Sequence, residues 1–83
     1  MSYFHKFRDP LVIKRIMDAI PEEKRSICHF CEGKLNQTPE WYEHDGGWFV
    51  ESLGMKVWIW LHCLKCGHDW SLTHLGVDRD VKF

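Results

Sequence analysis

The segment Cys63–Trp70, "CLKCGHDW", decides the fold, because it places two cysteines three positions apart and follows them with a glycine. A second pair stands in "CHFC", Cys28–Cys31, and the 83-residue sequence has no other cysteine. A Cys-x-x-Cys turn brings two sulfurs to one side, and two such turns complete a tetrahedral shell of four thiolates. The sequence therefore predicts one metal ion, held by four ligands: Cys28, Cys31, Cys63 and Cys66.

The two cysteine pairs differ in the residue that follows them. Gly67 comes directly after Cys66, where a residue with positive φ lets the chain curl around a metal ion. In the first pair Glu32 holds that place and Gly33 comes one position later. We expect the first turn to be the less regular of the two.

The four cysteines have possible roles other than binding one metal ion. Two disulfides are the minor case, because paired Cys-x-x-Cys motifs and an expected cytoplasmic location favour metal. A thioredoxin-like redox pair would need a βαβ unit, for which the chain is too short and wrongly ordered. A closed shell leaves no position for water or substrate, so we expect one structural Zn²⁺. Iron in the same shell would make an electron carrier, and the sequence does not separate the two metals.

Composition is that of one globular domain, with 45% hydrophobic and 28% charged residues. A core of this size is marginal without a metal, disulfides or a partner. The net charge of −1 provides no bulk positive field for nucleic acid or an acidic membrane. No signal-peptide pattern and no run near the ~20 apolar residues of a membrane span is present, so a cytoplasmic protein without a membrane partner is expected.

The first 26 residues read as an arm followed by an amphipathic helix. Asp9 is a plausible N-cap with Pro10 in the first turn, and apolar residues recur at helical spacing until Pro21. This predicts a helix near residues 10–20. Residues 27–83 are expected to form the metal-binding domain, as one folding unit with the helix.

Strand patterns follow from Glu40 onward. "EWYEH" and "WFVES" flank "DGG", which predicts a hairpin turn at Asp45–Gly47. "KVWIWLH" and "DWSLTHL" predict two further strands. The expected fold class is a small α+β domain, with an N-terminal helix followed by three to four antiparallel strands.

The two motifs "CHFC" and "CLKCGHDW" resemble a zinc ribbon, in which two Cys-x-x-Cys knuckles surround one zinc beside a small antiparallel sheet. The resemblance covers roughly residues 27–75. It implies that residues 27–83 form a zinc-ribbon domain, so that the N-terminal helix is followed by a zinc ribbon of three to four antiparallel strands. The second knuckle is similar to those of transcript-cleavage factors and small RNA polymerase subunits. Those cleavage factors carry adjacent acidic residues in their hairpin, whereas Glu43 and Asp45 are not adjacent, so that role does not carry over.

Three histidines lie near the cysteines and invite a mixed shell: His29, His62 and His68. With four cysteines available such replacement is unnecessary. We expect these histidines to be exposed or to form hydrogen bonds to sulfur.

Four residues are candidates for partner binding. Trp58 and Trp60 lie on one face of a strand, and that face either packs inside the domain or forms a contact surface. Lys14 and Arg15 belong to a basic N-terminal segment that is either a solvated helix face or a phosphate contact.

These observations predict a non-catalytic module with structural zinc, acting as a small accessory or regulatory subunit through contacts with a larger protein. No constellation for an active site or a small-molecule substrate is evident. The alternative is a nucleic-acid-associated or transcription-linked ribbon that uses the basic arm. A rubredoxin-like electron carrier ranks third.

Overall fold

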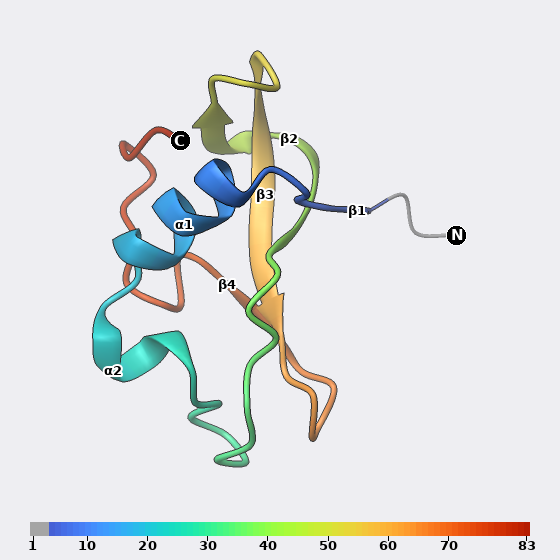
Figure 1. The fold of residues 1–83 in the computed structure, drawn as a ribbon, viewed down its shortest axis with the longest axis vertical. Coiled ribbons are helices and arrows are strands. Elements are labelled where there is room, and N and C mark those ends of the chain that lie inside the picture. Colours follow the sequence, from blue (N-terminus) through green and yellow to red (C-terminus); the bar gives the residue numbers. More distant parts are fainter. Residues whose placement is uncertain (1–3) are drawn as a thin grey trace.

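The computed structural model describes residues 4–83 and shows two helices beside an antiparallel sheet (Figure 1). In chain order the elements are β1 (His5–Lys6), α1 (Pro10–Ala19), α2 (Glu22–Arg25), β2 (Glu40–Val50), β3 (Met55–His62) and β4 (Asp69–Ser71). The predicted small α+β class with three to four antiparallel strands is confirmed at this level. Residues 1–3 of the predicted arm lie outside the described residues.

The sequence suggested that the helix is the first element, but β1 precedes it. His5 pairs with Trp41 of β2, and their rings stack with centroids 4.6 Å apart. Phe7 is buried beside the same indole, and its N–H donates to the Pro39 carbonyl at 3.1 Å. Aromatic packing on Trp41 thus holds the arm against the sheet. The sequence analysis considered only helix signals in this segment and did not predict the strand.

Helix α1 begins and ends where the sequence predicted. The N–H of Leu11 donates to Asp9 Oδ1 at 3.0 Å, and Pro10 occupies the first turn. Such a cap satisfies one of the backbone donors that the first helical turn leaves free. The apolar face of α1 is buried in the core through Val12, Ile16 and Met17. Neither helix is long and apolar enough to cross a membrane.

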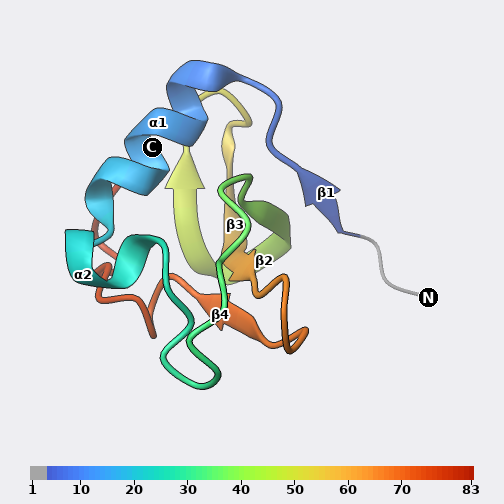
Figure 2. The same ribbon diagram turned by 60° about the horizontal axis from the view of Figure 1, so that its bottom comes forward.

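The strands follow one another in the sheet in chain order, β1-β2-β3-β4. One face of β3 is fully buried through Val57, Ile59 and Leu61, in the same core cluster as the buried face of α1. Figure 2 shows both helices on one side of the sheet. Trp58 and Trp60 point to the other face and are half-buried.

The predicted hairpin turn at Asp45–Gly47 is wrong. Strand β2 continues through these residues, and Glu43 and Trp48 both pair with Val57, so that residues 44–47 form an irregularity within the strand. A side chain at Gly47 would place its Cβ 2.0 Å from the Val57 carbonyl oxygen. Glycine is therefore needed here for close approach of two backbones.

The turn between β2 and β3 lies instead at residues 51–54. Gly54 has a φ of +66°, and its N–H donates to the Val50 carbonyl at 2.9 Å. The last predicted strand is also shorter than its pattern, since β4 ends at Ser71. Leu72 and Leu75 leave the sheet and are buried in the core from a turn.

Candidate metal centre

Two turns of the same design carry the cysteines. In the first turn, residues 28–33, the Cys28 N–H donates to the Gly33 carbonyl at 2.8 Å. In the second turn, residues 63–68, the Cys63 N–H donates to the His68 carbonyl at 2.8 Å. These matched bonds close both turns around their sulfurs.

Backbone pairing holds the two turns against each other. Leu35, just after the first turn, forms an antiparallel bridge with Cys63, and the Leu64 N–H donates to the Lys34 carbonyl at 2.9 Å. Gly33 contributes to the close fit, because a Cβ on it would lie 2.5 Å from Lys65 Cβ. The positions of the four sulfurs therefore follow from main-chain geometry as well as from side-chain rotamers.

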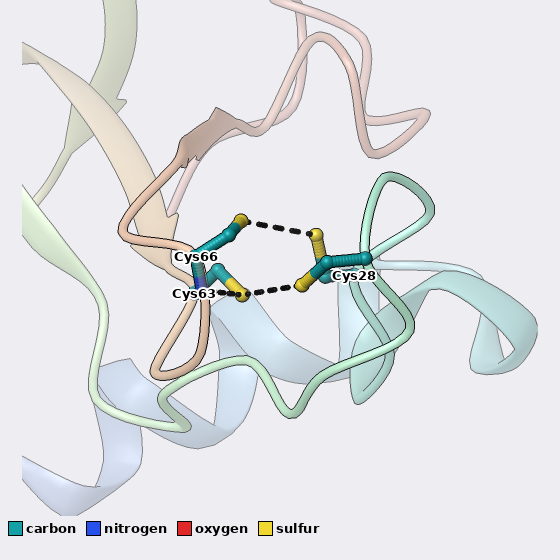
Figure 3. Close-up of side chains that lie close together, drawn as sticks. Cys28, Cys63 and Cys66 are labelled. Carbon is teal, nitrogen blue, oxygen red and sulfur yellow. Dashed lines mark hydrogen bonds between the residues drawn. The ribbon is translucent and has the colours of Figure 1, made fainter.

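The four sulfurs converge, all lying within 4.8 Å of one another. Cys31 Sγ and Cys63 Sγ are 3.4 Å apart, and Cys28 Sγ and Cys66 Sγ are 3.9 Å apart (Figure 3). A tetrahedral shell with Zn–S distances of about 2.3 Å separates its sulfurs by about 3.8 Å. All four cysteines are free thiols. The predicted clustering is confirmed, and the cluster is of a size that could bind one metal ion.

The thiols differ in their tendency to ionise. Burial opposes ionisation of Cys28, but the N–H groups of Cys31 and Phe30 and the indole of Trp70 lower its pKa to about 6. The backbone N–H of Cys66 lowers the pKa of Cys63. The His68 N–H lowers the pKa of Cys66, yet burial and its three sulfur neighbours raise it to about 12. Four crowded sulfurs cannot all carry negative charge unless a cation lies among them.

The indole of Trp70 donates a hydrogen bond to a sulfur. Its Nε1–H lies 3.2 Å from Cys28 Sγ. The histidines that the sequence suggested for this role do not fill it within the described residues. His62 is paired with Asp69 at 2.6 Å, and His29 and His68 are exposed. The sequence signal for this donor was a tryptophan four positions after the last cysteine. Its contact with the first turn depends on the register of β4 in the sheet, which the sequence does not give.

The predicted partner-binding residues lie apart from the cluster. Lys14 and Arg15 are exposed on α1, and the Lys14 ammonium pairs with Asp18 at 2.8 Å, which lowers the pKa of that carboxyl. On the sheet, Trp58 packs against Trp48, and their ring centroids are 5.1 Å apart.

Trp60 packs against side chains at the surface. The ring of Tyr42 lies 5.6 Å from it and that of Phe4 6.0 Å, and both of these rings are themselves exposed. The face that holds Trp58 and Trp60 is therefore partly packed and partly open.

The cysteine turns also expose two large apolar side chains that the sequence analysis did not single out. Phe30 is 79% exposed in the first turn, and Leu64 is 65% exposed in the second. The Phe30 ring stacks on the ring of His68 in the second turn, with centroids 6.3 Å apart. Phe30 and Leu64 therefore lie at the same end of the molecule. Each of them occupies an x position of a Cys-x-x-Cys motif, and this placement was the sequence signal that could have identified them.

Comparison of the chain with protein-family models, with curated proteins and with solved structures found no match. The functional interpretation therefore depends on the four-cysteine cluster and its surroundings.

Proposed function

We propose that this protein is a zinc-ribbon module that binds one structural Zn²⁺ and acts as a small accessory or regulatory subunit through protein–protein contacts. The observation that carries the proposal is the convergence of four free thiols from two matched turns. Zinc sites with this ligand set are typically structural, and their binding energy contributes directly to folding.

A four-thiolate shell leaves no coordination position for water or substrate. The ion in this proposal therefore joins the two turns and performs no chemistry. We accordingly propose a non-catalytic role. An electron carrier with iron in the same shell is the competing assignment, and metal content separates the two.

The first experiment determines the metal. Protein purified without added metal should be colourless and contain one equivalent of zinc by elemental analysis. Removing the metal with a chelator should lower the melting temperature sharply, and one equivalent of zinc should restore it. Visible thiolate-to-iron absorption bands in the purified protein would replace the zinc assignment with an electron carrier.

The accessory role is supported by the exposed side chains on the cysteine turns. Phe30 and Leu64 present apolar surface at one end of the molecule, where the metal would hold both turns rigid. Large apolar side chains held on a rigid frame are typical anchors of protein interfaces. We propose that this end contacts the larger protein.

The second experiment tests that surface. We expect the zinc-loaded parent to bind one defined protein directly, after its identification by crosslinking, and a Phe30→Ser, Leu64→Ser variant to lose that binding. Leu11→Ser is the matched control, because Leu11 is 67% exposed but lies on α1. Equal binding by all three proteins would exclude the turn surface. Association with nucleic acid through Lys14 and Arg15 stays a prediction, and salt-dependent binding to DNA or RNA would be its signature.

A further inference from the structure

A groove on the sheet face opposite α1 contains a second group of metal-binding residue types. It has a volume of about 720 Å³, and its walls include the aromatic rings of Tyr42 and Trp60. Glu40, His62 and Asp69 lie together in its lining. None of these three residues belongs to the four-cysteine cluster.

The strands fix this group in place. Glu40 pairs with Trp60 across β2 and β3, and His62 pairs with Asp69 across β3 and β4. Side chains two residues apart on a strand share a face, so Trp60 and His62 point into the same groove. His62 Nδ1 and Asp69 Oδ1 are 2.6 Å apart, which sets the orientation of the imidazole ring. Three adjacent strands thus bring the three side chains to one point.

Glu40 is the unusual member of the group. The residue is only 6% exposed, yet its carboxylate has no hydrogen bond or ion pair with any residue from 4 to 83. Lys6 is its cross-strand neighbour and lines the same groove, but no ion pair forms between them. Neither of its carboxylate oxygens is a buried atom without a partner, so the carboxylate keeps contact with the solvent of the groove, where a cation can reach it. A cation in the groove would supply the missing partner.

We propose that Glu40, His62 and Asp69 bind a second divalent metal ion. Their ligand atoms lie within 4.8 Å of one another, the same limit that the four sulfurs meet. One imidazole and two carboxylates are harder ligands than thiolates and suit ions such as Mn²⁺, Fe²⁺ or Zn²⁺. Three protein ligands leave coordination positions open toward the groove for water or for a donor atom of a bound molecule.

This second site does not depend on the proposed zinc-ribbon function, although His62 is adjacent to Cys63 in the sequence. The two sites differ in chemistry, because four thiolates select zinc or iron whereas carboxylates accept manganese. Mn²⁺ is therefore the probe that reports the groove and leaves the cysteine cluster occupied by zinc.

The test begins with zinc-loaded protein of measured metal content, to which Mn²⁺ is added while the electron paramagnetic resonance signal of free Mn²⁺ is followed. We expect one Mn²⁺ to bind per chain, and Glu40→Gln to weaken its binding at least about tenfold. Glu43→Gln is the matched control, because Glu43 is an exposed carboxylate on the same strand, and it should leave the affinity unchanged.

Asp69→Asn provides a second variant in case Glu40→Gln fails to fold, since Asp69 is exposed and its replacement leaves the core intact. The melting curve of each zinc-loaded variant shows whether it is folded. Absence of Mn²⁺ binding to the parent at millimolar concentration overturns the second site, as does unchanged binding by a folded Glu40→Gln or Asp69→Asn variant. Loss of zinc from the cysteines would appear in the metal content instead, so the two proposals fail separately.

Discussion

The two cysteine turns share a hydrogen-bond pattern but reach it with different residues. The position after the second cysteine has positive φ in both turns, +62° at Glu32 and +78° at Gly67. The N–H of each donates back to the carbonyl of the first cysteine of its turn, at 2.8 Å and 3.1 Å. The turn therefore requires positive φ at this position whichever residue occupies it, and glycine is the residue that adopts this conformation at the lowest cost in free energy.

The turns also differ in what flanks them. The second turn joins β3 to β4, so its ends are held by backbone pairing within the sheet. The first turn lies between α2 and β2 and is flanked by two isolated bridges, Ile27 to Lys34 and Leu35 to Cys63. If zinc binds as proposed, the first turn depends more on the ion for its conformation than the second turn does.

The largest expected effect comes from removing a thiolate. Cys28→Ser and Cys63→Ser should each abolish stable zinc binding, because the energy of metal binding is part of the folding energy in small zinc domains. Metal content and the melting curve are the measurements. Full zinc occupancy with an unchanged melting temperature in either variant would show that its cysteine is not a ligand.

The contact between the turns should be the next most sensitive feature. Gly33→Ala places a methyl group against Lys65, and overpacking of this kind typically costs about 1–3 kcal/mol of unfolding free energy. Gly46→Ala is the control, because a Cβ there would meet only atoms of the flexible His44 and Arg79 side chains. Chemical denaturation of the zinc-loaded proteins compares them, and equal stability of the two variants would contradict the close fit.

Exchanging the residues at the positive-φ position should have opposite effects in the two turns. Gly67→Ala should lower the free energy of unfolding by about 1–2 kcal/mol, whereas Glu32→Gly should raise it by a fraction of that amount. Both effects follow from the cost of a left-handed conformation for a residue with a Cβ. Denaturation midpoints measure them, and a destabilised Glu32→Gly variant would mean that the Glu32 side chain contributes something that its φ does not reveal.

The smallest expected effect concerns the indole that links β4 to the first turn. Trp70→Phe keeps an aromatic ring but removes the donor to Cys28 Sγ, which should cost about 1 kcal/mol. Zinc should also leave this variant faster when a chelator is added, since hydrogen bonds to ligands support metal affinity. Trp41→Phe is the comparison, because the Trp41 indole N–H forms no hydrogen bond within residues 4–83. Identical zinc-release rates in the two variants would remove the proposed role of Trp70.

The predictions that succeeded depended on local chemistry. The helix follows from Asp9, Pro10 and the apolar spacing after them, and the thiol cluster follows from the Cys-x-x-Cys spacing. Strand β3 was equally predictable, because a short apolar run with apolar side chains on both faces is typical of a strand that packs on a core.

The failed hairpin turn and the missed contacts involve pairing between distant segments. Asp45–Gly47 has the composition of a turn, yet Gly47 is required by the backbone of Val57, which only the β2–β3 register brings close. The same holds for the hydrogen bond from Trp70 to Cys28, and for the meeting of Glu40 with His62 and Asp69. Residue spacing along one strand does not fix its register against the next, so these contacts could not be read from the sequence.

The order of the strands in the sheet has a consequence for how the chain folds. β2, β3 and β4 are consecutive in the chain and adjacent in the sheet, so their pairing requires only short loops to close, and such contacts form quickly. The cysteines of the two turns are 32 to 38 positions apart, and the intervening chain contains both β2 and β3. We therefore expect the β2–β3 hairpin to act as the nucleus and metal capture to complete folding, so that chelation should accelerate unfolding much more than it slows the first pairing of the strands.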